Sequence, residues 1–229
     1  MMIMIVSHKH KFIFLKTQKT GGTSVETGLS QFCGEDDIIT PDDEVLRIRM
    51  GYPASRNCGY DKWRNYTLRD WYRLIKRGRR KIIFYNHMPA REILSLVGED
   101  VWNSYFKFCF ERNPWDKTIS YYHFKYRFKK GDALSQFIHS NKLYNASDWR
   151  MYTLADKPAV DFVGRYENLD EDLATICKKI DVPVIKELPR LKGNIRKDHQ
   201  HYHDVLSRHD TERISEVFSK EIEHFGYRY

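Results

Sequence analysis

The sequence lacks the features of exported, membrane-spanning and disulfide-rich proteins. Its longest early apolar stretch, residues 1–6, is too short for a signal peptide. No apolar run approaches the roughly 18 residues that a membrane span requires. The cysteines show no CxxC spacing and, without an export signal, are expected to be reduced thiols; they are Cys33, Cys58, Cys109 and Cys177. These absences predict a soluble, unprocessed protein of the cytoplasm.

What is present indicates one folded, basic domain. Among the 229 residues, 41% are hydrophobic and 14% aromatic, which excludes a disordered or low-complexity chain. No internal repeat is visible, so we expect a single domain over residues 1–229. The 39 Lys and Arg exceed the 31 Asp and Glu by 8. This charge favours a polyanionic ligand, nucleic acid or acidic lipid as partner, although a merely soluble basic protein can share it.

Apolar runs that alternate with helical patterns predict an α/β fold. Buried strands are expected at 11–15, 82–85, 105–110 and 160–163. Helices are expected at 23–31, 68–77, 89–97, 114–128, 170–180 and 211–225. Such an order predicts three layers, with a mostly parallel central sheet covered by helices on both faces.

Two segments fall outside this regular alternation. Residues 33–66 contain glycines, prolines and scattered charges without a clean period, and their aromatic residues favour a folded lid over a linker. The basic run at 76–81 (KRGRRK) ends the helix expected at 68–77. Cations are favoured at helix C-termini, so we interpret this run as a solvated helix end.

The loop after the first predicted strand has the properties of a phosphate-binding loop. Residues 16–24 (KTQKTGGTS) place two glycines before a helix, so backbone N–H groups and a helix N-terminus can face an anion. Lys19 adds a full positive charge. The spacing differs from GxxxxGK[ST], since Gly22 stands where the lysine would be, and no strand-end Asp for magnesium is evident. An ordinary tight turn is the alternative.

A second cationic position follows the strand expected at 105–110. Arg112 stands at the end of this strand, where its guanidinium can form a fork onto a phosphate. Ser120 lies about two turns into the next helix and can add a hydroxyl donor. The alternative is a structural Arg112 that pairs with Glu111 or Asp116.

These two motifs resemble those of the sulfotransferase superfamily. KTGGTS at 19–24 is similar to the family's 5′-phosphosulfate loop, and Arg112-Asn113-Pro114 with Ser120 is similar to its 3′-phosphate motif. FERNPWDKTISYY is closer to the Golgi-type and bacterial branch that modifies carbohydrates than to the cytosolic small-molecule branch. The resemblance implies a phosphate-loop α/β fold and the donor 3′-phosphoadenosine 5′-phosphosulfate (PAPS), with no metal.

The resemblance also implies roles for individual residues. Lys19 would stabilise charge on the leaving 5′-phosphate, and Arg112 with Ser120 would hold the 3′-phosphate. The loop that wraps the phosphosulfate would comprise Thr20, Gly21, Gly22, Thr23 and Ser24. Tyr166 would lie near the adenine, and a late basic loop with Lys192, Gly193 and Arg196 would close over the 3′-phosphate. Cytosolic members carry a Trp where Ser24 stands, so adenine stacking must come from elsewhere.

His87 is the candidate general base. It follows the apolar run 82–85, and imidazole has a reference pKa near 6.5, suited to taking the proton of an acceptor hydroxyl. Several members of the family use a His at a similar place. A hydrogen-bonded structural His is the alternative, with Glu26 or a loop carboxylate as a reserve base.

A metal site, two rival functions and the identity of the acceptor were also considered from the sequence. His199, His201 and His203 form only an HxxxH spacing without the HExxH glutamate, so no metal site is expected. Rival functions are a kinase with a degenerate phosphate loop, and a nucleic-acid-binding module that uses the basic runs. We expect a sulfotransferase whose acceptor hydroxyl is on a carbohydrate or glycolipid, with no nucleic-acid partner. The acceptor walls would come from 33–66 and 123–155.

Overall fold

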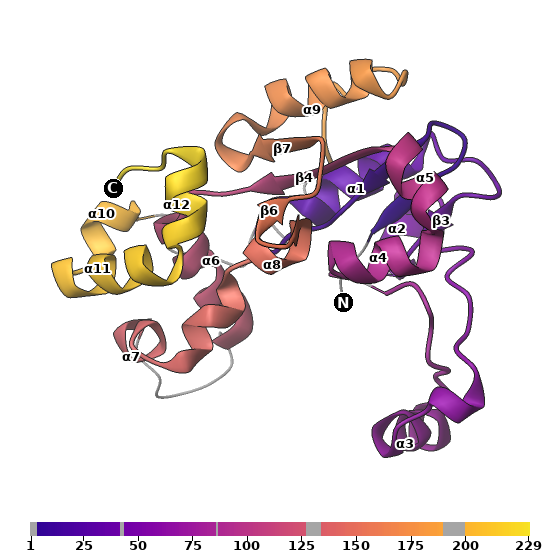
Figure 1. Cartoon of the computed structure of the whole chain (residues 1–229), viewed down its shortest axis with the longest axis horizontal. Coiled ribbons are helices and arrows are strands. Elements are labelled where there is room, and N and C mark those ends of the chain that lie inside the picture. The colour runs from indigo at the N-terminus through magenta and orange to yellow at the C-terminus, as the bar shows by residue number, and fades with distance from the viewer. Residues whose placement is uncertain (1–3, 42–43, 86, 127–133, 190–199) are drawn as a thin grey trace.

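The chain is described by a computed structural model that covers residues 4–41, 44–85, 87–126, 134–189 and 200–229 (Figure 1). Its central sheet has the strand order β3-β1-β2-β4-β7, and β5 and β6 form a separate pair. The strands are β1 (Ile5–Ser7), β2 (Phe12–Phe14), β3 (Ile38–Ile39), β4 (Phe106–Glu111), β5 (Thr153–Leu154), β6 (Lys157–Pro158) and β7 (Phe162–Arg165).

Helices surround the sheet and extend beyond it. They are α1 (Gly22–Ser30), α2 (Glu44–Arg49), α3 (Leu68–Arg77), α4 (Ala90–Val97), α5 (Glu99–Ser104), α6 (Pro114–Tyr126), α7 (Leu134–Ile138), α8 (Trp149–Tyr152), α9 (Leu169–Lys179), α10 (Tyr202–Val205), α11 (Arg208–Val217) and α12 (Ser219–Phe225). Short 3₁₀ turns are η1 (Trp63–Asn65), η2 (Asn141–Ala146) and η3 (Tyr166–Asn168).

The α/β fold is confirmed, and the sheet is mixed. β2, β4 and β7 run parallel, whereas β1 pairs antiparallel with both β2 and β3. The expectation of a mostly parallel sheet therefore holds only for its β2-β4-β7 part. The apolar run at 1–6, which we considered only as a possible signal, supplies β1; an antiparallel neighbour needs only a short connection to β2 and no crossover helix.

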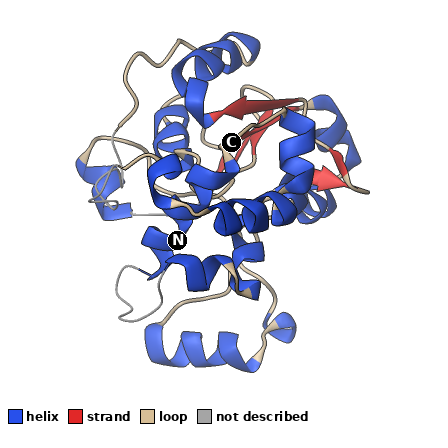
Figure 2. Cartoon of the chain, turned by 90° about the vertical axis from the view of Figure 1, so that its left-hand side faces the viewer, coloured by secondary structure: helices blue, strands red, loops and turns tan. Residues whose placement is uncertain are grey.

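Two buried cores cover the two faces of the sheet, as the three-layer expectation required. Along β4, Phe106, Phe108 and Phe110 point to the face covered by α1 and α9. Cys109 points to the opposite face, where residues of α4, α5 and α8 pack. Alternate side chains of a strand point to opposite faces, so these helices form the outer layers. Figure 2 shows helices on either side of the strands.

A third core lies beyond the carboxyl ends of the parallel strands. Trp115 and Ile119 of α6 pack there with residues of α7 and α11. The single helix expected at 211–225 is divided, because Phe218 leaves the helical conformation and is fully buried between α11 and α12. Helices α7, α8 and α10 were not predicted, since each has only four or five residues.

The expectations for residues 33–97 need two corrections. Residues 82–85 form no sheet strand; Ile82 makes an isolated antiparallel bridge to Tyr60 instead. A run of four apolar residues cannot reveal its pairing partner. The insertion at 33–66 is more ordered than expected, since it contains β3, α2 and η1. The helices at 68–77 and 89–97 are confirmed by α3 and α4.

Candidate functional site

The loop between β2 and α1 is fixed to the end of β4. The Thr17 hydroxyl donates to the carbonyl of Phe110 and lies 3.0 Å from the Thr20 hydroxyl. Thr20 is 1% exposed, so its side chain holds the turn, and its hydroxyl faces away from solvent. Gly21 caps α1 with φ of +72°, a left-handed conformation that favours glycine. The predicted strand, glycine turn and helix are thus confirmed.

The absence of a side chain at Gly22 leaves room for Lys16, which was not predicted as a site residue. A Cβ at Gly22 would lie 2.7 Å from Cγ of Lys16, which passes beneath the turn. The Lys16 ammonium donates to the Thr23 hydroxyl at 2.8 Å and lies 4.0 Å from the Glu26 carboxylate. Two lysines therefore flank this loop, one buried below it and the other, Lys19, at its turn.

Glu26 does not fit the reserve-base role. Its carboxylate is fully buried and binds the guanidinium of Arg47 at 3.0 Å. Arg47 is also buried and donates to the carbonyl of Pro53 at 2.7 Å. Glu26 therefore links α1 to the insertion through an ion pair, and that pairing makes it a structural group.

Arg112 joins the two predicted cationic positions. Its Nη1 donates to the Lys19 carbonyl at 2.9 Å and to the Ser120 hydroxyl at 3.3 Å. Its Nε and Nη2 bind the Asp116 carboxylate at 2.9 and 2.6 Å. The predicted contact of Arg112 with Ser120 and the alternative pairing of Arg112 with Asp116 are therefore both present. One guanidinium can make both contacts because it carries five N–H donors.

Lys19 and Tyr166 complete this cluster. Lys19 has φ of +61°, and its ammonium lies 4.3 Å from the centre of the Phe124 ring. The Arg112 guanidinium lies 4.1 Å from the centre of the Tyr166 ring. A Cβ at Gly21 would lie 3.3 Å from the same ring, so Tyr166 borders both the loop and Arg112. Lys19, Gly21, Arg112, Ser120 and Tyr166 thus gather from separate elements.

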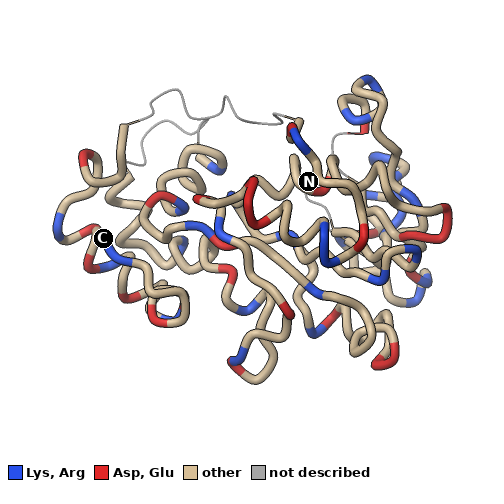
Figure 3. Tube along the Cα trace, turned by 90° about the horizontal axis from the view of Figure 1, so that it is seen from above, with Lys and Arg blue, Asp and Glu red and all other residues tan. Residues whose placement is uncertain are grey.

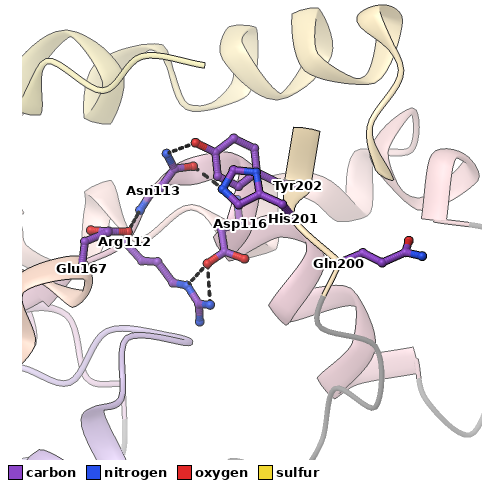
Figure 4. A pocket seen from close by; sticks show the side chains of 7 residues that line it. All are labelled: Arg112, Asn113, Asp116, Glu167, Gln200, His201 and Tyr202. Carbon is purple, nitrogen blue, oxygen red and sulfur yellow. Dashed lines mark hydrogen bonds and ion pairs between the residues drawn. The ribbon is translucent and has the colours of Figure 1, made fainter. Parts of the chain in front are cut away.

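A pocket of about 410 Å³ opens beside Arg112 (Figure 4). It is lined by Arg112, Asn113, Asp116, Glu167, Gln200, His201 and Tyr202. Asn113 caps α6, since its Oδ1 accepts from the backbone N–H of Trp115 at 3.1 Å. The predicted Asn cap and first-turn Pro114 are confirmed by this bond and by the start of α6. Five of the lining residues were not predicted as site residues: Asp116, Glu167, Gln200, His201 and Tyr202.

His87 reaches the same loop from a different segment. Its Nδ1 lies 2.5 Å from the Lys16 carbonyl oxygen. A carbonyl only accepts, so Nδ1 carries the proton and Nε2 of the neutral ring is left as an acceptor. Burial lowers the pKa of His87 to about 4, against the opposing effect of the Asp148 charge. The imidazole is therefore neutral at pH 7. His87 does not follow a strand, contrary to the prediction, because residues 82–85 form none.

A buried ionic network supports the loop from below. The Lys117 ammonium lies 2.8 Å from both the Glu111 and the Asp148 carboxylates, and all three side chains are at most 1% exposed. Asp148 also accepts from the backbone N–H of Gln18 at 2.6 Å. The network thus joins β4, α6 and the start of α8 to the loop. No local sequence signal identifies Asp148, because its partner Gln18 is 130 positions away.

The remaining candidates lie elsewhere or outside the described residues. Lys192, Gly193 and Arg196 fall within 190–199, outside the part of the chain that the structure describes. His201 and His203 stack on one another with ring centres 4.8 Å apart. Among the described residues, no group of three or more His, Cys, Asp or Glu is arranged to hold a metal. No helix within those residues has the length and apolarity to cross a membrane.

Comparison with known proteins supplies a family match. A model described as "Sulfotransferase family" matches residues 3–228. The chain is 46% identical over 101 residues to an uncharacterized protein of Archaeoglobus fulgidus, in an alignment that covers 42% of this chain and 84% of that protein. No solved structure matches the chain.

Proposed function

The chain belongs to the sulfotransferase family, and from this premise we propose that it transfers the sulfuryl group of PAPS to an acceptor hydroxyl. The observation that carries the choice of donor is the guanidinium of Arg112, which bonds both the Lys19 carbonyl and the Ser120 hydroxyl. This contact joins the backbone of the predicted phosphosulfate loop to the predicted 3′-phosphate position. A nucleotide with phosphates at its 5′ and 3′ ends needs such a pair.

The 5′-phosphosulfate would bind at the start of α1. The backbone N–H groups of residues 21–23 and the helix N-terminus would attract an anion there, since the N–H of Ser24 already donates to the Gly21 carbonyl. Lys19 would contribute its ammonium to the bridging oxygen between sulfur and phosphorus. Thr23 and Ser24 would complete the loop around the group, whereas the buried Thr20 side chain would act through its backbone.

The 3′-phosphate would bind at Arg112 and Ser120, whose nitrogen and oxygen already lie 3.3 Å apart. Tyr166, whose ring lies against the guanidinium, would border the nucleoside. Lys192, Gly193 and Arg196 would close over the phosphate, as the resemblance implies. The Asp116 carboxylate would share Arg112 with the phosphate, since Nε and Nη2 both bind it.

Transfer would proceed by attack of the acceptor oxygen on sulfur, in line with the leaving phosphate. Nε2 of His87 would take the acceptor proton, because Nδ1 is engaged with the Lys16 carbonyl and the ring is neutral. The bond from sulfur to the phosphate oxygen breaks, and adenosine 3′,5′-bisphosphate leaves with the electron pair. Lys19 and the loop amides would stabilise the charge that develops, so the proposed mechanism uses no metal ion.

Thermal unfolding with nucleotides tests the donor. Adenosine 3′,5′-bisphosphate without magnesium should raise the unfolding midpoint, while ATP and ADP should raise it less. Lys19→Met should reduce turnover strongly, and the exposed Lys125→Met on α6 should not. Preferential stabilisation by ATP with magnesium would point to a kinase and contradict the proposed donor.

His87→Asn tests the base. Asn tolerates the φ of +51° at this position, and its amide can replace Nδ1–H toward the Lys16 carbonyl. Turnover should fall by about 10² to 10⁴ while binding of adenosine 3′,5′-bisphosphate stays unchanged. Equal loss of binding would instead assign His87 a structural role.

The acceptor is proposed to be a saccharide hydroxyl, free or on a glycolipid, on the strength of the FERNPWDKTISYY resemblance. Transfer of labelled sulfate from PAPS to saccharides of the source organism, followed by mass spectrometry of the product, identifies it. Labelling of a non-saccharide hydroxyl in the same extract would overturn this choice and leave the donor unaffected.

A further inference from the structure

The positive charge of the chain is concentrated in one segment, residues 60–82, which we name the basic arm. These residues contain nine Lys or Arg and two Asp, a net charge of +7. The whole chain has +8, so all other residues together carry +1. Along the rest of the described trace, basic and acidic residues are interspersed (Figure 3). Within the described residues, the arm therefore carries a concentrated charge that favours an anionic partner.

The basic arm projects from the body on a short two-stranded stalk. Tyr60 and Ile82 form its antiparallel bridge, and the backbone N–H of Asp61 donates to the Lys81 carbonyl at 2.8 Å. Figures 1 and 2 both show α3 standing away from the other helices. Within the described residues, the hydrogen bonds, ion pairs and ring contacts of 61–81 are all made inside the arm.

Helix α3 begins and ends through local signals. Thr67 and Asp70 form a reciprocal capping box, and Gly78 ends the helix in the left-handed conformation. Trp71 stacks on Trp63 with ring centres 5.7 Å apart, which holds one side of the helix against η1. The body of the protein is thus not needed to position this helix.

Next to Trp71, α3 exposes an amphipathic surface to solvent. Leu68, Tyr72 and Ile75 form an apolar stripe at helical spacing and are 90%, 58% and 79% exposed. The adjoining stripe is entirely basic and exposed; its members are Arg69, Arg73, Lys76 and Arg77. Their spacing places them on the neighbouring face, because each residue advances the helix by about 100°. A contiguous exposed apolar stripe indicates an interaction surface. A second copy of the chain is a poor partner for it, because the neighbouring basic residues of the two copies would repel each other.

We propose that the basic arm docks the protein on an anionic lipid bilayer. The apolar stripe would enter the boundary between headgroups and acyl chains, and the basic stripe would bind lipid phosphates, as in interfacial amphipathic helices. Trp63 and Tyr60 lie at the same end of the molecule and are 49% and 57% exposed, and such rings favour the membrane interface. A nucleic acid would use the charges and leave Leu68 and Ile75 in water.

Vesicle co-sedimentation tests the docking with the full chain. The protein should bind vesicles of equal parts phosphatidylcholine and phosphatidylglycerol, and should not bind pure phosphatidylcholine. Leu68→Gln with Ile75→Gln leaves the charge unchanged and should weaken binding about tenfold or more, because it removes buried apolar area. The matched control is Leu96→Gln with Val184→Gln, which alters side chains of the body that are 43% and 44% exposed. This pair should bind as the wild type does.

Three outcomes would overturn the proposal. Vesicle binding that is unaffected by the Leu68 and Ile75 changes would mean attraction by charge alone. Binding to duplex DNA, together with failure to bind the anionic vesicles, would identify the arm as a nucleic-acid contact. A dimer in sedimentation analysis that the Leu68 and Ile75 changes dissociate would make the stripe a self-interface. An unchanged unfolding midpoint for both variant pairs checks that the fold is retained. No donor or acceptor is needed, so the outcome is independent of the proposed function.

Discussion

Arg112 has a carboxylate partner where the proposed function requires a phosphate. Asp116 binds Nε and Nη2 of Arg112 and so neutralises the guanidinium before any ligand arrives. Asp116→Asn keeps an acceptor toward Arg112 and removes the competing charge. We expect adenosine 3′,5′-bisphosphate to bind several-fold more tightly, a gain of about 1 kcal/mol, measured by titration calorimetry.

Adenosine 5′-monophosphate is the control for this change, since it lacks the 3′-phosphate. Its affinity should be the same in the wild type and in Asp116→Asn. Weaker binding of the bisphosphate would mean that Asp116 orients Arg112 productively. An equal gain for both nucleotides would mean a general electrostatic effect.

His87 makes folding stability depend on acidity. Burial lowers the pKa of the folded imidazole to about 4, while the unfolded residue titrates near its ordinary 6.5. The unfolded state therefore binds the proton first, and stability is lost as the pH falls from about 6.5 toward 4. Between pH 7 and pH 5, the wild type should lose about 2 kcal/mol more than His87→Asn in urea unfolding. Parallel curves for the two proteins would contradict the buried neutral ring.

At this scale, the sequence led to Lys19, Arg112, Ser120 and Tyr166, and the structure places them together. Lys19, Arg112 and Ser120 stand in local motifs that the sequence shows directly, whereas Tyr166 was expected only from the resemblance to the family. Lys16 and Asp148 were missed because their roles come from tertiary contacts, with Gly22 above one and Gln18 beside the other. Whether these residues bind the donor stays a prediction.

The attachment of α6 to β4 depends on a charge that is fully buried. Lys117 neutralises Glu111 and Asp148, each 2.8 Å away. Lys117→Met would leave two carboxylates buried without their cation, and burial already raises the pKa of Glu111 to about 7. We expect a loss of about 3 to 5 kcal/mol in the free energy of unfolding, measured with urea at pH 7.

Lys125→Met is the matched control on the same helix. Lys125 is exposed, so its replacement should alter the free energy of unfolding by no more than about 0.5 kcal/mol. If Lys117→Met also stayed within about 1 kcal/mol, the network would contribute little to stability, and α6 would be held mainly by the apolar packing of residues such as Trp115, Ile119 and Tyr121.

Helices with local start and stop signals were predicted well, and so were the three parallel strands β2, β4 and β7; the run 82–85 and the short strands β1 and β3 were not. The helix at 68–77 matches α3 because Thr67 and Gly78 mark its ends. The run 82–85 resembles a buried strand in composition, yet it turns to Tyr60 and leaves the sheet. β1 and β3 have three and two residues, too few for any periodicity to appear.

For the molecule as a whole, the net charge predicted an anionic partner but did not show where on the molecule such a partner would bind. The sum of +8 suggests an anionic partner in general, and the donor alone would account for it. The structure separates the two sources of charge, because the +7 of residues 60–82 stands on a stalk away from α1 and α6, the helices that follow the two predicted phosphate positions (Figure 1). The basic run at 76–81, expected to be a solvated helix end, belongs to this arm.

The same separation predicts that the arm can be removed. The backbone N–H of Asp61 donates to the Lys81 carbonyl, so Asn-Gly in place of residues 62–80 can close the stalk as a two-residue hairpin turn. Since 61–81 make their bonds within the arm, the unfolding midpoint should change by less than about 4 °C, or about 1 kcal/mol for a chain of this size. Binding of adenosine 3′,5′-bisphosphate should be unchanged, and the protein should leave a cation exchanger at lower salt. A midpoint lowered by about 10 °C or more would show that the arm supports the body of the protein.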